Sequence, residues 1–155
     1  MSHSYSIKIL GDAGVGKTSF IQKIITDTFK KQWNPTFGTV IHPIVFETSY
    51  GPITLTIVDT DGQSKHDSIQ YENYDGTILM FDLTSNLSYR NIPYWHTKCG
   101  NEPAWLIGNK TDCKDIKVTE VNEATTISVK KGTWRPVICE ILRNLSGHSD
   151  LTLIE

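Results

Sequence analysis

A glycine-rich stretch near the start of the chain has the residue types and the spacing that bind phosphate groups. Residues 11–18 read GDAGVGKT and fit the pattern G-x-x-x-x-G-K-[ST]. Glycines let the backbone approach a phosphate closely, so that successive N–H groups point at its oxygens, and a following helix adds its positive N-terminal end. Lys17 would reach the β- and γ-phosphates, and the Thr18 hydroxyl would ligate Mg²⁺. The residues expected at the phosphates are Asp12, Ala13, Gly14, Val15, Gly16, Lys17, Thr18 and Ser19.

A second motif, DTDGQ, spans residues 59–63 and follows an apolar β-branched run. An acidic residue at the end of a strand is where a further Mg²⁺ ligand is needed, so Asp59 is expected to hold the metal through water. Gly62 could offer its N–H to the γ-phosphate, and Gln63 would be the catalytic residue that orients an attacking water. Alone, D-x-x-G also suits a surface turn, but its place after a phosphate-binding loop favours the metal site.

The third motif, NKTD at residues 109–112, predicts which base is bound. The carboxylate of Asp112 can accept hydrogen bonds from the N1–H and the exocyclic amine of guanine, whereas adenine presents no such pair of donors. The stem of Lys110 could cover one face of the base, and Asn109 could tie this loop to the phosphate loop. The three motifs together predict GTP or GDP as the ligand, with Mg²⁺, and disfavour an ATP-using enzyme.

Short β-branched runs alternate with amphipathic segments, which indicates an α/β architecture built from βαβ units. The pattern predicts a P-loop NTPase G domain over residues 1–155, a single domain. Its sheet should be roughly six-stranded, mostly parallel, with one antiparallel edge hairpin, and flanked by helices. We expect strands at 5–10, 44–49, 53–58, 77–81, 104–107 and 125–129, and helices at 17–28 and 135–145, the last closed by Gly147.

The overall composition is that of an ordinary globular protein. The formal net charge of the 155 residues is −2, and no run of like charges indicates a nucleic-acid partner. The three cysteines are widely spaced, unlike a metal or disulfide pattern, which is typical of a reducing compartment. No stretch approaches the roughly 20 apolar residues of a membrane span. We therefore expect a soluble, intracellular monomer.

With these motifs in place, the chain resembles the Ras superfamily of small GTPases and, within it, the Ran family. The Ran resemblance is carried by residues 39–46 (TVIHPIVF), 51–53 (GPI), 88–96 (SYRNIPYWH) and 29–33 (FKKQW). It implies that Phe29 stacks on the guanine, that Thr36 binds Mg²⁺ and the γ-phosphate, and that a last base-contacting loop contains Ser128, Val129 and Lys130.

The same resemblance implies a role and partners. A Ran-like protein would bind nuclear transport receptors of the importin-β type through its switch regions, and would be found in the cytoplasm and the nucleus. The sequence ends in LTLIE without a cysteine, so no prenyl anchor to a membrane is expected.

Two substitutions depart from the family pattern beside the γ-phosphate. Ala13 stands where glycine is usual, and its methyl group would crowd Gln63 and a partner's arginine finger. Asp61 stands where the family has alanine, and a carboxylate about 4 Å from a phosphate costs about 4 kcal/mol at an effective dielectric constant near 20. These residues predict slow hydrolysis. They leave two readings open: a switch that hydrolyses GTP, or a poorly hydrolysing pseudo-GTPase that stays loaded with GTP and occupies Ran partners as a binding module.

The chain is also shorter than Ran between Asp112 and Ser128, where residues 118–124 leave room for only a stub of a helix. This shortening puts contacts with an exchange factor and a GTPase-activating protein in doubt, whereas contacts through the first switch are still expected.

Overall fold

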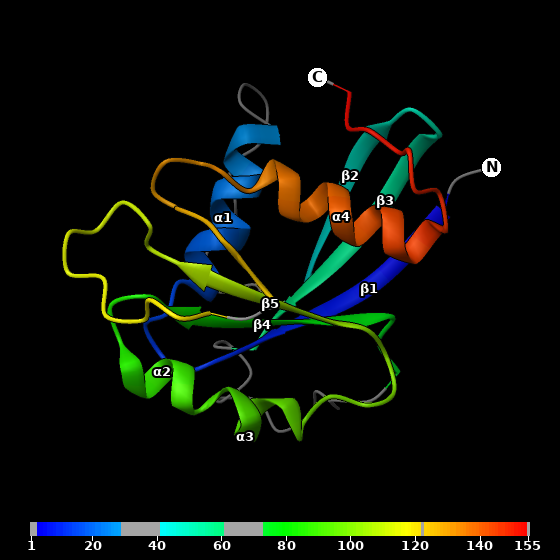
Figure 1. Ribbon diagram of the computed structural model, residues 1–155. Coiled ribbons are helices and arrows are strands. Elements are labelled where there is room, and N and C mark those ends of the chain that lie inside the picture. Colours follow the sequence, from blue (N-terminus) through cyan, green and yellow to red (C-terminus); the bar gives the residue numbers. More distant parts are fainter. Residues whose placement is uncertain (1–2, 29–40, 61–72, 122, 155) are drawn as a thin grey trace.

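The computed structural model describes residues 3–28, 41–60, 73–121 and 123–154. Their centre is a six-stranded sheet in the order β2-β3-β1-β4-β5-β6 (Figure 1). The neighbouring strands are parallel, except that β2 and β3 form an antiparallel hairpin at one edge. This is the predicted sheet. Its strands are β1 (His3–Leu10), β2 (Ile41–Thr48), β3 (Gly51–Asp59), β4 (Gly76–Asp82), β5 (Ala104–Asn109) and β6 (Ala124–Thr126).

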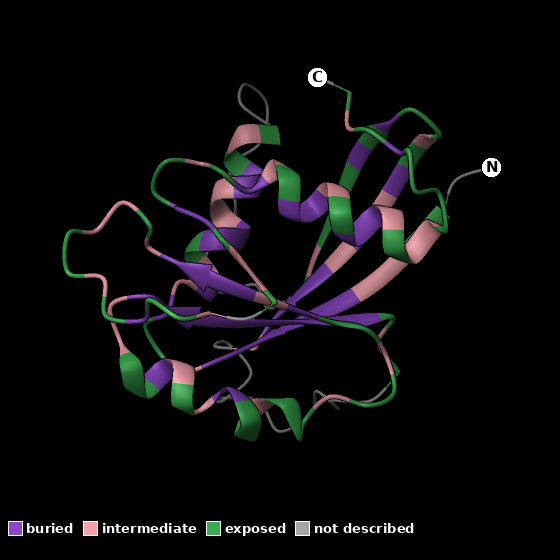
Figure 2. Ribbon diagram, viewed as in Figure 1, coloured by how far each residue is buried: buried purple, intermediate pink, exposed green. Residues whose placement is uncertain are grey.

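Helices cover both faces of the sheet, with α1 and α4 on one face and the short α2 and α3 on the other (Figure 1). The apolar stripe of α1 (Lys17–Thr28) and that of α4 (Arg135–Ser146) pack against β1, β3 and β4 in one large core. A smaller core lies between the sheet and α2–α3. All seven residues of β4 are buried, as expected for a central parallel strand covered on both sides (Figure 2).

The two long helices begin and end close to where the sequence predicts. Helix α1 has the predicted bounds. Helix α4 ends at Gly147, whose φ of 78° is left-handed and whose N–H donates to the carbonyl of Arg143. A glycine adopts this conformation without the steric penalty that a Cβ atom would bring, which explains why the helix stops there.

Helices α2 (Asn86–Arg90) and α3 (Ile92–His96) were not among the predicted elements. Each has five residues, too few to show a helical period in the sequence. Ser85 caps α2 by accepting a hydrogen bond from the N–H of Ser88, and Pro93 lies in the first turn of α3.

Two strand boundaries differ from the prediction by three residues, and several others differ by one or two. Strand β2 begins at Ile41 rather than at residue 44, because the antiparallel pairing with β3 extends to that residue. Strand β6 ends at Thr126 rather than at residue 129. Beyond it the N–H groups of Ser128 and Val129 donate to the side chains of Thr133 and Asn109, so the backbone leaves the sheet.

The end of the described chain pairs with the β2–β3 hairpin. The N–H of Ser49 donates to the carbonyl of Thr152 over 2.9 Å, and the N–H of Ile154 donates to Glu47 over 2.8 Å. In the shortened region the stub of a helix was expected at 118–124, but the described residues of that stretch, 118–121 and 123–124, contain no helix. Among the described residues, no helix has the length and apolar character needed to cross a bilayer.

A buried lysine that the sequence analysis did not predict lies on a central strand of the sheet. Lys8 on β1 has no solvent exposure, and its Nζ lies 2.8 Å from Oε1 of Glu102, in the loop before β5. The hydroxyl of Thr77 on β4 donates to the same carboxylate oxygen over 3.1 Å. A buried charge of this kind is tolerated because a carboxylate of opposite charge accompanies it.

Candidate functional site

Four segments far apart in the sequence meet at one edge of the sheet. They are the loop after β1, the end of β3, the loop after β5, and the loop after β6. Strands β1, β4 and β5 all end on the left of the view in Figure 1. The carboxyl ends of parallel strands are where α/β proteins bind ligands, because the loops that follow them are brought together there.

The glycines of the first loop let the chain pass close to its neighbours. Gly16 has φ of +110°, and a Cβ atom there would lie 2.3 Å from Nδ2 of Asn109. A Cβ atom at Gly11 would lie 2.2 Å from the carbonyl oxygen of Met80. Both distances are far below van der Waals contact, so only glycine permits this packing.

Lys17 places a positive charge inside this loop. It is 1% exposed, and its Nζ donates to the carbonyl oxygens of Gly11 over 2.6 Å and Asp12 over 2.7 Å. Lys17 is also the first residue of α1, whose first-turn N–H groups carry the positive end of the helix dipole. The ammonium group of Lys17 and the positive end of helix α1 are together suited to binding a phosphate group.

Thr18 and Asp59 bring two oxygen atoms together where the metal is expected. The Thr18 hydroxyl donates to Oδ2 of Asp59 over 2.7 Å, and Asp59 at the end of β3 is 5% exposed. Mg²⁺ prefers oxygen ligands and takes few of them from the protein, completing its octahedron with water and substrate phosphates. The pair fits that requirement, and a bound Mg²⁺ would neutralise phosphate charge beside Lys17.

Asn109 joins three of the four segments and is 3% exposed. Its Nδ2 donates to the carbonyl of Val15 over 2.9 Å, which is the predicted tie to the phosphate loop. Its Oδ1 accepts from the N–H of Val129 over 3.0 Å and from the N–H of Lys110 over 2.7 Å. One side chain thus fixes the positions of the loops after β1, β5 and β6 relative to one another.

Asp112 lies beside the loop after β6. The hydroxyl of Ser128 donates to Oδ1 of Asp112 over 2.7 Å, and the N–H of Lys131 donates to the same hydroxyl over 3.0 Å. The hydrogen bond from Ser128 is the main reason that the pKa of Asp112 lies below its ordinary value, against a smaller effect of burial. The charges of Lys130 and Lys131 lower that pKa further. At neutral pH, Asp112 is therefore an acceptor only, as recognition of guanine requires.

Lys110 has a partner that sequence reasoning missed. Its Nζ lies 2.7 Å from Oδ2 of Asp82, at the end of β4, and donates to the carbonyl of Gly14 over 3.2 Å. Burial raises the pKa of Asp82, but the hydrogen bonds from Lys110 and Thr84 lower it more, so the net shift is downward. An acidic residue directly after an apolar strand is the same signal that singled out Asp59, and it could have identified Asp82.

The side chain of Asp12 is held by residues outside the three motifs. Its carboxylate accepts from Nδ2 of Asn91 over 2.7 Å and from Nε1 of Trp95 over 2.8 Å. Spacing in the sequence alone could not assign either partner to this site, because Asn91 lies at the junction of α2 with α3 and Trp95 lies within α3, far from the phosphate loop in the sequence.

The structure places the other predicted residues as follows. Within the phosphate loop, Val15 is buried, whereas Ala13 and Gly14 are exposed. Ser19 on α1 and Lys130 after Val129 are also exposed. The positions expected to hold the γ-phosphate and the attacking water lie outside the described residues, and their roles stay predictions. These positions are Thr36, Gly62 and Gln63. Phe29, expected to stack on the guanine, and Asp61, expected to repel the γ-phosphate, also lie outside the described residues.

Comparison with known protein families agrees with this geometry. The sequence model of the Ras family matches residues 6–135, which is most of the chain. The chain belongs to the Ras family. As a Ras-family protein it is a small GTP-binding switch protein, and its sheet is that of a Ras-type G domain. Proteins of this family bind GTP and GDP, typically with Mg²⁺, and contact effectors through their switch regions.

Proposed function

We propose that this chain is a Ran-like switch protein that binds GTP and GDP with Mg²⁺ and acts in nucleocytoplasmic transport. The observation that supports nucleotide binding is the hydrogen bonding of Asn109. It joins the phosphate loop, residues 11–18, to the expected guanine-recognition loop, residues 109–112, and to the loop after β6; we call these three loops the cradle. Lys17 and the Thr18–Asp59 pair serve the phosphates and Mg²⁺ at one end, and Asp112 serves the base at the other.

Slow hydrolysis is part of the proposal. Ala13 is exposed on the phosphate loop, and its methyl group occupies space that a water-positioning glutamine and an arginine finger would share. An arginine finger is worth about 10³ to 10⁵ in rate, so excluding it matters more than slowing the intrinsic reaction. The second candidate, a pseudo-GTPase that stays loaded with GTP, rests on the same residue and on Asp61.

The Ran-like role is supported by the stretches at 39–46, 51–53 and 88–96, which are more specific to the Ran family than the three nucleotide-binding motifs. In the stretch 88–96, Asn91 and Trp95 donate hydrogen bonds to Asp12 of the phosphate loop. The resemblance therefore includes residues that contact the site. The expected partners are nuclear transport receptors of the importin-β type, and the expected location is the nucleus and the cytoplasm.

The deciding experiment denatures the purified protein and identifies the released nucleotide by chromatography. It is paired with single-turnover hydrolysis of added GTP. GTP released with little turnover favours the constitutively loaded binding module, and GDP with measurable turnover favours a hydrolysing switch. A protein that contains no nucleotide and binds neither GTP nor GDP would refute the proposal.

Two further measurements separate the parts of the proposal. The double variant Ala13→Gly, Asp61→Ala should turn over GTP faster if these residues block catalysis, and unchanged turnover would reject that explanation. A purified importin-β-type receptor should retain the protein loaded with a non-hydrolysable GTP analogue more strongly than the GDP form. Equal or absent retention would remove the Ran-specific role and leave the GTP-binding protein.

A further inference from the structure

Asp12 introduces a negative charge into the loop that is built to hold phosphates. Its backbone carbonyl accepts a hydrogen bond from Lys17 over 2.7 Å, so its main chain belongs to the cradle. A carboxylate in this loop would repel a nucleotide's phosphates if it turned toward them, because like charges in a site of reduced dielectric constant repel strongly.

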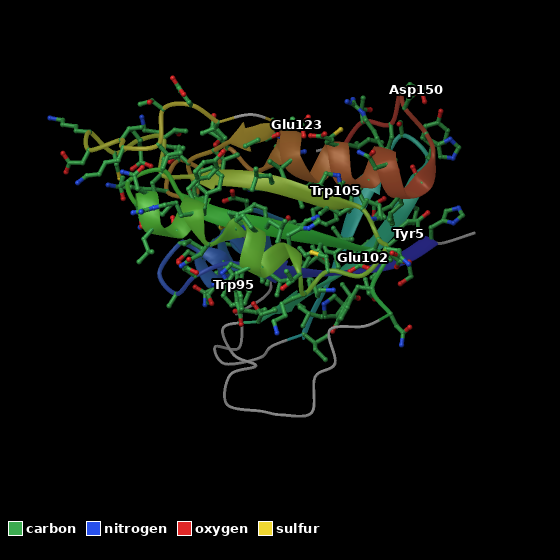
Figure 3. The ribbon with its side chains drawn as sticks, turned by 60° about the horizontal axis from the view of Figure 1, so that its bottom comes forward. Tyr5, Trp95, Glu102, Trp105, Glu123 and Asp150 are labelled. Carbon is green, nitrogen blue, oxygen red and sulfur yellow. The ribbon has the colours of Figure 1, made fainter. Side chains whose placement is uncertain are left out.

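Both oxygen atoms of that carboxylate are held elsewhere. Nδ2 of Asn91 donates to Oδ2 over 2.7 Å, and Nε1 of Trp95 donates to Oδ1 over 2.8 Å. The two donors lie 79 and 83 residues away in the sequence, at the junction of α2 with α3 and within α3. Figure 3 shows Trp95 on the side of α3 that faces the blue phosphate loop.

The packing around the donors fixes their direction. Trp95 is part of the smaller core between the sheet and α2–α3, and the ring of Tyr94 meets its ring edge-on, with the centroids 5.1 Å apart. Hydrogen bonds to a charged acceptor are stronger than those between neutral groups, so two fixed donors are sufficient to hold this carboxylate in one orientation.

We propose that Asn91 and Trp95 are positioning residues that hold the carboxylate of Asp12 away from the phosphates and thereby set the relative affinities for GTP and GDP. The inference rests on the proposed nucleotide binding. Removing a donor frees the carboxylate to approach the cradle, and the resulting repulsion is larger for GTP because its γ-phosphate adds negative charge. The short helices α2 and α3 thus act on the nucleotide without touching it.

The test measures dissociation constants for GTP and GDP on the full chain with Mg²⁺. Trp95→Phe removes the indole N–H and retains an aromatic ring. It should weaken GTP binding about tenfold and GDP binding about threefold, the scale of one lost charge-assisted hydrogen bond. Because the cause is repulsion between charges near the surface, both effects should shrink at high salt. The matched control is Tyr94→Phe, an exposed neighbour on the same helix, which should leave both constants within twofold of the wild type.

A double-mutant cycle separates this role from simple packing. In an Asp12→Asn background there is no carboxylate to restrain, so adding Trp95→Phe should change the GTP affinity by less than about twofold. Asn91→Ala removes the other donor, should act in the same direction, and replaces Trp95→Phe if that variant fails to fold. The inference would be overturned if Trp95→Phe lowered GTP affinity equally in the wild-type and Asp12→Asn backgrounds. It would also be overturned if the loss of affinity did not depend on salt concentration and was the same for GTP and GDP. A wild-type chain that binds neither nucleotide would instead overturn the proposed function and the inference together.

Discussion

Replacing Asn109 by alanine removes the side chain that joins the loops after β1, β5 and β6. Two of its partners, the carbonyl of Val15 and the N–H of Val129, belong to buried residues and would lose their hydrogen bonds. Each buried polar group left without a partner costs about 1 to 3 kcal/mol. For two such groups we therefore expect the free energy of unfolding to fall by about 2 to 6 kcal/mol, a large fraction of the 5 to 15 kcal/mol typical of a domain.

The assay is urea unfolding in the absence of nucleotide, so that loss of ligand binding does not contribute. With a slope of about 2 kcal/mol per molar urea, the midpoint of urea unfolding should fall by about 1 to 3 M. Asn109→Asp keeps the acceptor for Val129 but turns a carboxylate oxygen toward the carbonyl of Val15, so it should be at least as destabilising. Asn144→Ala is the control. This exposed asparagine donates a hydrogen bond to the carbonyl of Glu140 in its own helix α4, and its loss should change stability by less than about 0.5 kcal/mol.

If Asn109→Ala instead unfolded at the same urea concentration as the wild type, the expected loss of stability would be contradicted. That result would mean that water or a shifted side chain satisfies both backbone groups, and the three loops would then have some other means of alignment.

Three further predictions concern single side chains. The pKa of Glu102 is lowered to about 2, since burial raises it but the hydrogen bond from Lys8 and those from the backbone lower it more. Because folding favours the ionised form, Glu102 contributes stability above its ordinary pKa of 4.5, and this contribution is lost as the pH falls from 4.5 toward 2. In urea unfolding, the free energy of unfolding of Glu102→Gln should therefore fall less steeply with decreasing pH than that of the wild type. Asp112→Asn should weaken GTP binding at least 100-fold in equilibrium titration, because about two charge-assisted hydrogen bonds to guanine are lost, while xanthosine triphosphate, which has an oxygen in place of the amine, gains affinity. Thr18→Ala should remove most of the effect of Mg²⁺ chelation on the rate of nucleotide release.

Each of these has its own control. For Glu102, an acid-unfolding curve that is parallel in wild type and Glu102→Gln would show that the carboxylate does not carry the effect. For Asp112, loss of both nucleotides alike would indicate a damaged loop rather than a changed base preference. For Thr18, the exposed Thr119 provides Thr119→Ala, in which chelation should accelerate release as in the wild type. If chelation accelerated release equally in Thr18→Ala, the hydroxyl would not be a metal ligand.

Much of the fold follows from local signals in the sequence. Helix α1 has the bounds that its apolar spacing predicts, and α4 stops at the glycine expected to close it. The central strands were predicted from unbroken apolar runs, since a strand covered on both faces needs no polar residues. The short helices α2 and α3 gave no such signal, because five residues complete little more than one turn.

The candidate site likewise contains residues that sequence motifs predict and contacts that they do not. Lys17, Asn109 and Asp112 could be assigned from motifs because backbone geometry and ligand chemistry dictate residue type and spacing. An acidic residue at the end of an apolar strand marks Asp82 itself, but its contact with Lys110 depends on how distant segments pack. The contact of Asp12 with Trp95 depends on such packing too, and no local pattern encodes either contact. The buried pair of Lys8 and Glu102 escaped prediction for the same reason, since 94 residues separate its members.

The assembly of the cradle from distant segments also bears on how the protein is made. The phosphate loop is synthesised early, but its tie to Asn109 spans 94 residues, and Ser128 and Val129 follow later still. A nascent chain emerges N-terminus first, so the loop leaves the ribosome well before the side chains that hold it in shape. Nucleotide capture must therefore wait until most of the sheet has been translated and paired. Once bound, the ligand stabilises the fold as a whole by mass action, because no single segment of the chain can retain it.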